Sequence, residues 1–389
     1  MKKFFGRLRS PSFDIMLIKN LLLYKTSGEF QIGDLACSGK IFVEPTLFNQ
    51  ENVLDGSGLY AIPGLIDLHL HGALGGDASD GSLSSLEKMA RYELTQGVTS
   101  ICPTTMTLPV SDLKKAMKTI GEAKKNLGER SARILGINME GPFISSKKKG
   151  AQKEENILPP SLEIFRELNE ASGNNIKLVD LAPEIEGALQ FIEATKNETR
   201  LSLAHTKANY VEALKAFQAG ARQVTHLFNA MPPFHHREPG LIGAALDSPN
   251  VKCELICDGV HCHEAAVRAS FKMFGYERLI LISDSMRATG LADGQYNLGG
   301  QEVNVQGNEA RLKDGTIAGS VTNLMSCVKK AVAFGIPLAH AIYSASTNPA
   351  LALGLENKFG SLEPGTVADF VLLDGDLNIK AVYKEGKLV

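Results

Sequence analysis

The sequence predicts an α/β protein: a TIM-like (β/α)8 barrel with a small β-sandwich formed by the two ends of the chain. Between residues 63 and 359, eight strand-like apolar runs alternate with amphipathic stretches at helical spacing, as in a parallel sheet covered by helices. Residue types that bind metals follow several of these runs, where a barrel forms its active site. No Gly-x-Gly-x-x-Gly pattern follows a strand, which argues against an open doubly wound sheet.

The two ends of the chain predict a separate β layer over residues 1–62 and 360–389. Short β-rich runs, bounded by turns and without a helical period, occur near both ends at 15–18, 40–43, 368–373 and 379–389. We therefore expect these ends to pair into one β-sandwich domain beside a barrel at 63–359.

Within 63–359 the order of elements is that of a barrel. Strands are expected at 65–68, 98–102, 134–139, 176–181, 201–204, 223–225, 251–257 and 279–283. Helices are expected at 84–96, 110–127, 161–171, 210–219, 264–274, 323–334 and 337–346. The glycine-rich stretch 294–319 alternates like a strand and predicts a β-hairpin inserted over the barrel mouth.

Composition limits the partners. The 389 residues are 44% hydrophobic with a formal charge of −2, which argues against binding nucleic acid or an anionic membrane surface. No apolar stretch is long enough to cross a bilayer. Partners should be small molecules or copies of the chain, and we expect a homodimer. The six cysteines match no zinc-knuckle spacing, so reduced thiols in the cytoplasm are expected.

His69 and His71 follow the first apolar run of the barrel. Residues i and i+2 of a strand project to one side, so the two imidazoles can converge on one point, as metal ligands do. Alone, the pair is equally compatible with a solvated strand edge or with histidines satisfied in a core.

Four further residues decide between these alternatives. Glu140 follows the third strand, His205 the fifth, His226 the sixth and Asp284 the eighth. Because the carboxyl ends of all barrel strands meet at one face, we expect a metal site there. Imidazoles with carboxylates suit Zn2+ or Fe2+, whereas Mg2+ and Ca2+ prefer oxygen ligands alone. Such an ion lowers the pKa of a bound water and polarises a carbonyl, and Asp284 could move protons. The chemistry predicted is hydrolysis of an amide or related bond.

The motifs resemble those of the amidohydrolase superfamily, in particular its N-acetylglucosamine-6-phosphate deacetylase family. The matching segments span nearly the whole chain: PGLIDLHLHG (63–72), EGPF (140–143), GAQ (150–152), AHT (204–206), THLFNAM (225–231), REPG (237–240), DGVH (258–261), SDSM (283–286), LGG (298–300), AGS (318–320) and PGTVAD (364–369). The resemblance implies hydrolysis of the acetamido group of N-acetylglucosamine 6-phosphate to glucosamine 6-phosphate and acetate.

Roles follow from the resemblance position by position. It assigns Glu140, His205 and His226 to the main metal site and Asp284 to general acid/base catalysis. His69 and His71 match a second metal position that some members lack, so one or two ions per subunit are expected.

The resemblance also implies substrate contacts. Asn229, Ala230 and Arg237 match phosphate-binding positions, although Arg237 could instead form a surface salt bridge with its neighbour Glu238. His261 matches a residue that touches the sugar or acetamido group, and Ile317 one that packs on the acetyl methyl. Gln152 replaces a histidine that in some members polarises the scissile carbonyl, and a neutral amide cannot carry charge.

Three alternatives remain open. The nearest is N-acetylgalactosamine-6-phosphate deacetylase, because the sequence does not reveal which epimer is preferred. Dihydroorotases, hydantoinases and deaminases are more distant, since the chain lacks their carboxylated-lysine pattern and carries the phosphate-binding set. A catalytically silent scaffold should have lost a metal ligand or the acid/base carboxylate, and none is missing.

Overall fold

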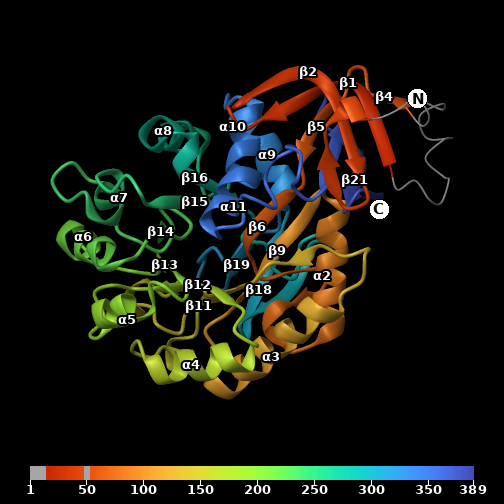
Figure 1. Ribbon diagram of the computed structural model, residues 1–389. Coiled ribbons are helices and arrows are strands. Elements are labelled where there is room, and N and C mark those ends of the chain that lie inside the picture. The colour runs from red at the N-terminus through yellow and green to blue at the C-terminus, as the bar shows by residue number, and fades with distance from the viewer. Residues whose placement is uncertain (1–14, 48–52) are drawn as a thin grey trace.

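The computed structural model describes residues 15–47 and 53–389, and residues 1–14 and 48–52 of the predicted β domain lie outside it. A parallel barrel of eight strands forms its centre, with helices around the outside and a separate sheet at one side (Figure 1). The predicted fold class is confirmed.

The barrel strands follow one another in chain order around the ring, each parallel to the next. They are β6 (Leu65–Leu70), β9 (Val98–Thr105), β11 (Ile137–Glu140), β12 (Ile176–Leu181), β13 (Arg200–Leu203), β14 (Gln223–Val224), β15 (Lys252–Ile256) and β16 (Leu279–Ile282). Hydrogen bonds just beyond the last strand close the ring: the Asp284 amide donates to the His69 carbonyl at 2.9 Å, and the His71 amide donates to the Ser285 carbonyl at 2.8 Å. The mouth is therefore closed at the residues that carry chemistry.

Helices cover the outside of this ring, and several begin with a side-chain cap. They are α2 (Leu83–Thr95), α3 (Val110–Asn126), α4 (Leu162–Ala171), α5 (Ala188–Thr195), α6 (Tyr210–Ala219), α7 (Gly240–Leu246), α8 (Glu264–Phe274), α9 (Leu324–Ala333), α10 (Leu338–Ile342) and α11 (Asn348–Ala352). Asn209 and Glu212 form a capping box at the start of α6, which satisfies two amides that the helix leaves free. A π-helix at Tyr343–Thr347 joins α10 to α11.

Two sequence predictions differ from the structure. The strand expected at 134–139 is two strands, β10 (Arg133–Ile134) and β11, because the register against β9 shifts by one residue between them: Ile134 pairs with Ile101, whereas Asn138 pairs with Thr104. The hairpin expected at 294–319 is a three-stranded antiparallel sheet of β17 (Gly294–Leu298), β18 (Gln301–Gln306) and β19 (Glu309–Leu312). Its apolar face packs on Met106 and Met286 beside the barrel mouth.

Strands from both ends of the chain share one sheet at the side of the barrel. It contains β1 (Ile15–Lys25), β2 (Glu29–Ser38), β3 (Ile41–Val43), β4 (Val53–Asp55), β5 (Tyr60–Pro63), β20 (Phe370–Leu373), β21 (Ile379–Lys384) and β22 (Lys387–Leu388). The ends meet where β20 pairs antiparallel with β5. Arg133 of the barrel reaches this sheet, with its guanidinium 2.5 Å from Asp369 and 2.9 Å from Glu385.

The remaining global features are simple. Among the residues described, no helix combines the length and apolar character needed to cross a membrane. All six cysteines are buried and free.

Candidate metal centre

Glu140, His205 and His226 form one buried group at the carboxyl ends of their strands. Glu140 is the last residue of β11, and the histidines follow β13 and β14 by two residues. Glu140 Oε1 lies 3.1 Å from His205 Nε2 and 3.3 Å from His226 Nε2, and the two Nε2 atoms are 3.1 Å apart. Three ligand-type atoms from three strands thus face one point.

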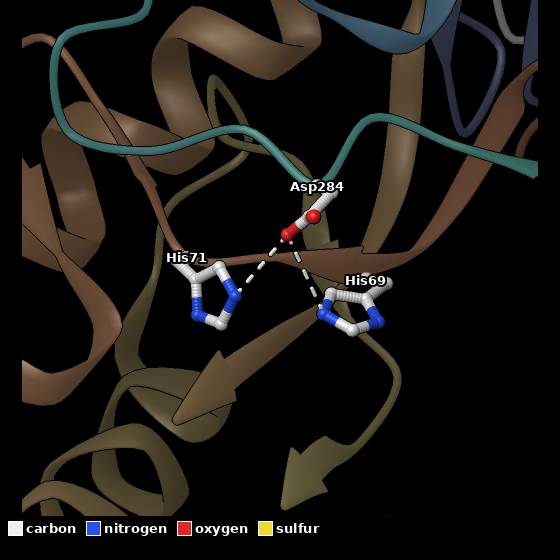
Figure 2. A group of neighbouring side chains, drawn as sticks. All are labelled: His69, His71 and Asp284. Carbon is white, nitrogen blue, oxygen red and sulfur yellow. Dashed lines mark ion pairs between the residues drawn. The ribbon is translucent and has the colours of Figure 1, made fainter. Parts of the chain in front are cut away.

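His69, His71 and Asp284 form a second buried group beside the first (Figure 2). Asp284 Oδ1 lies 3.2 Å from His71 Nε2 and 3.6 Å from His69 Nε2. Figure 2 shows both imidazoles turned toward this carboxylate, so the strand spacing does make the pair converge.

Glu140 joins the two groups. Its Oε1 is 3.5 Å from His69 Nε2, and its Oε2 is 3.4 Å from His71 Nε2. One carboxylate therefore has an oxygen within reach of all four histidines, which suits a ligand shared between two ions.

The opposite ring nitrogens of three histidines are occupied. The Nδ1 atom of His69 lies 3.2 Å from Glu254 Oε2, that of His71 3.1 Å from the Thr104 carbonyl, and that of His205 2.9 Å from the Lys148 carbonyl. An imidazole whose Nδ1 donates a proton keeps a lone pair on Nε2, as a metal ligand requires. The donor set therefore fits a divalent transition metal, since ligand atoms in each group lie within 4.8 Å of one another.

Three of these residues have left-handed backbone conformations. The φ angle is 43° at His205, 30° at His226 and 49° at Asp284. Such conformations cost non-glycine residues about 1–3 kcal/mol each and are frequent at active sites. The bend immediately after each strand is what places these side chains over the mouth.

The two carboxyl groups of the centre have lowered pKa values despite their burial. Burial would raise the pKa of Glu140, but the close imidazoles of His205, His226 and His69 hold it well below its ordinary value. Burial likewise opposes ionisation of Asp284, yet the neighbouring imidazoles of His71 and His69 lower its pKa. Both carboxyl groups are therefore ionised at neutral pH.

A cavity of about 500 Å³ opens onto both groups. Of the site residues predicted from the sequence, those that line this cavity are His71, Glu140, Gln152, His205, His226, Asn229, Ala230, His261, Asp284 and Ile317. His69 is fully buried behind them. Arg237 is not part of the described lining: it is exposed on the segment after Pro232, and its guanidinium contacts His236 at 2.8 Å.

Gln152 is held in one orientation at the cavity wall. Its Oε1 accepts the Thr107 amide proton at 2.8 Å, so its amide group points inward and donates to Glu140 Oε2 at 2.6 Å. In this arrangement the Gln152 amide group is hydrogen-bonded to Glu140 and is not available to a ligand in the open cavity.

His261 is paired with a carboxylate three residues earlier. Its Nδ1 lies 2.7 Å from Asp258 Oδ2, and both side chains are at least 94% buried. Burial lowers the pKa of His261, but the ion pair with Asp258 outweighs it and raises the pKa above its ordinary value.

Sequence reasoning missed several residues at the site. Glu254 and Asp180 are fully buried near His69, and an acidic residue inside the barrel strand was in each case the available signal. Lys147, Lys148 and Lys149 line the cavity and are visible in the sequence as a basic run before Gly150.

Comparison with known proteins agrees with this geometry. The Amidohydrolase family pattern matches residues 60–389. N-acetylglucosamine-6-phosphate deacetylase of Bacillus subtilis is 40% identical over 331 residues, covering 84% of each chain. N-acetylgalactosamine-6-phosphate deacetylase of Escherichia coli O157:H7 is 39% identical over 336 residues, covering 84% of this chain and 86% of the other.

A solved structure is similar over nearly the whole chain. It is a variant N-acetyl-D-glucosamine-6-phosphate deacetylase from Mycobacterium smegmatis in complex with N-acetyl-D-glucosamine-6-phosphate, 32% identical, with a TM-score of 0.89. The match covers 96% of this chain and 99% of that one. The chain therefore belongs to the amidohydrolase family, together with the deacetylases of N-acetylated amino-sugar 6-phosphates.

Proposed function

We propose that the protein hydrolyses the acetamido group of N-acetylglucosamine 6-phosphate to glucosamine 6-phosphate and acetate. The observation that carries the proposal is the pair of buried ligand groups that share Glu140 and face one cavity. Relatives that align over most of the chain are deacetylases of this type, which supports the substrate class.

Glu140, His205 and His226 are proposed to hold the main ion, and His69 and His71, together with the shared Glu140, a second one. Zn2+ and Fe2+ both suit this donor set, with one or two ions per subunit. A divalent ion bound there would lower the pKa of a water molecule and polarise the amide carbonyl.

Asp284 is proposed as the general base and then the general acid. Its ionised carboxylate lines the cavity and can accept a proton from the attacking water. The same proton then passes to the amine nitrogen as the carbon–nitrogen bond breaks and acetate leaves. Asp284 Oδ1 lies 3.2 Å from His71 Nε2, so the carboxylate faces the centre.

The phosphate end of the substrate is proposed to meet Asn229, Ala230 and Arg237. Asn229 and Ala230 line the cavity, whereas Arg237 lies on an exposed segment outside it. For Arg237 to act, this segment must close on the cavity or a second copy of the chain must supply the guanidinium. That requirement accords with the homodimer that we propose.

The remaining contacts concern the sugar and the acetyl group. His261 is proposed to touch the sugar or acetamido group, and Ile317 to pack on the acetyl methyl, since both line the cavity. Gln152 is proposed to support the reacting centre through its hydrogen bond to Glu140. The division into a barrel at 63–359 and a β-sandwich of 1–62 and 360–389, and a cytoplasmic location, are also proposals.

Acetate release from the two epimeric substrates tests the function. The enzyme is assayed with N-acetylglucosamine 6-phosphate and N-acetylgalactosamine 6-phosphate, together with elemental analysis of protein purified without added metal. We expect a higher kcat/KM for the glucosamine epimer. The similarity to the galactosamine enzyme makes the reverse preference the second candidate, and no acetate from either epimer with metal present would refute both.

A further inference from the structure

A hydrogen-bonded series of buried polar side chains lies behind His69, across three neighbouring strands. Arg200 Nε donates to Gln223 Oε1 at 2.6 Å, and Gln223 Nε2 donates to Glu254 Oε1 at 2.6 Å. Glu254 Oε2 in turn lies 3.2 Å from His69 Nδ1. Gln223 and Glu254 are fully buried, so water cannot replace these hydrogen bonds.

Arg200, the member of this series farthest from His69, sets the direction of every hydrogen bond in it. A guanidinium can only donate, so Gln223 must present its oxygen to Arg200 and its amide group to Glu254. Arg200 cannot turn away, because it also donates to the carbonyls of Ala352 and Arg222. Glu254, as an acceptor on both sides, therefore requires a donor at His69 Nδ1.

Glu254 also contacts the first ligand group. Its Oε2 lies 3.4 Å from the backbone amide of His226, the same oxygen that faces His69. One carboxylate oxygen thus holds a residue from each group of ligands.

We propose that Glu254, oriented by Gln223 and Arg200, is a positioning residue that keeps His69 protonated on Nδ1 and so keeps a lone pair on Nε2. This inference rests on the proposed metal-dependent function. A neutral imidazole carries one proton, and only the unprotonated nitrogen can bind a metal. Carboxylates that hold a ligand histidine in this way typically change metal affinity by about 10–100-fold when removed.

A single substitution should reverse the tautomer. In Glu254→Gln the new side chain has one acceptor, and Gln223, held by Arg200, already donates to it. The amide group of the new side chain then faces His69 Nδ1, which becomes its acceptor, and the hydrogen bond from the His226 backbone amide is lost. The proton moves to Nε2, and His69 can no longer serve as a ligand.

Exchanging the two side chains should restore the tautomer. In the double variant Gln223→Glu, Glu254→Gln, the carboxylate at 223 accepts from Arg200 and from the amide at 254. The oxygen at 254 is then free to accept the His69 Nδ1 proton. Composition and net charge equal those of the wild type, so a recovered site reports the direction of the hydrogen bonds.

The tautomer is measured by 15N NMR of histidine-labelled full-length protein with Zn2+ bound. His69 should carry its proton on Nδ1 in the wild type and in the double variant, and on Nε2 in Glu254→Gln. His71 is an internal control, because its Nδ1 pairs with the Thr104 carbonyl and should not change. Asp180→Asn is the matched variant: this carboxylate lies 4.0 Å from His69 Nδ1, too far to accept the proton, so its loss should leave the tautomer as it is.

Metal retention is the second measurement. The more weakly held ion should dissociate from Glu254→Gln at about 10–100-fold lower chelator concentration than from the wild type, and the double variant should recover. Thermal unfolding establishes that each variant folds. A wild-type His69 protonated on Nε2 would overturn the proposal without any variant, as would a folded Glu254→Gln with unchanged metal retention. Neither measurement uses the sugar substrate, so a failed deacetylase assay would refute the proposed function and not this inference.

Discussion

Asp284→Asn separates proton transfer from metal binding. The Asp284 side chain is 10% exposed, and its Oδ1 lies 3.2 Å from His71 Nε2, so asparagine fits the same space and keeps one oxygen for that contact. It cannot accept a proton from the attacking water. General acid–base catalysis contributes about 10²–10⁴-fold, which corresponds to about 3–5 kcal/mol of transition-state stabilisation. We expect kcat to fall by that factor.

The assay combines steady-state acetate release with elemental analysis of the same sample. The ion at Glu140, His205 and His226 should remain, and substrate should still bind, because its other contacts lie elsewhere. Asp314→Asn is the matched control: Asp314 lines the same cavity but is exposed, so kcat should change little. Near-normal turnover of Asp284→Asn, or full recovery on adding metal, would refute the proton-transfer role.

Three further predictions concern other parts of the molecule. Arg237→Ala should raise KM for the phosphorylated sugar by roughly 10–1,000-fold while leaving unphosphorylated N-acetylglucosamine unaffected; equal losses on both would argue against a phosphate contact. The double variant His69→Asn, His71→Asn should lose one ion by elemental analysis and part of its activity, whereas unchanged metal and turnover would mean that the pair is vestigial. Glu385→Gln should lower the free energy of unfolding at pH 7 by about 1–2 kcal/mol, less than its pKa shift implies because solvent screens the pair. Since burial raises the Glu385 pKa but its bonds to Lys40 and Arg133 lower it to about 2, this deficit should disappear as the pH falls from 4.5 toward 2, and a pH-independent difference in denaturant midpoint would contradict it.

Most of the barrel could be predicted because its pattern is local. Each apolar run is bounded by turn residues, and the helices expected at 210–219 and 264–274 match α6 and α8 to the residue. The barrel topology then determines where the site lies, because parallel strands in a closed ring bring their carboxyl ends to one face. For this reason His69, Glu140 and Asp284, far apart in sequence, could be expected to converge before their distances were known.

What the sequence did not reveal depends on side-chain direction and on the paths of loops. The interior partner of His69 is Glu254, and only the registers of β13, β14 and β15 align it with Gln223 and Arg200. The exposed position of Arg237 follows from the course of an irregular segment, which no periodicity specifies. The third strand of the 294–319 sheet is short and partly polar, so its pattern resembles a turn.

The left-handed backbone at His205, His226 and Asp284 restricts what can replace them. Asparagine, aspartate, histidine and glycine accept such φ angles, whereas valine, isoleucine and threonine clash with their own carbonyls. Random mutagenesis at these three positions should therefore rarely return folded protein with valine, isoleucine or threonine, whatever the effect on catalysis. The backbone conformation therefore limits which ligand residues natural variation can place at this centre. This limit acts before any metal is bound.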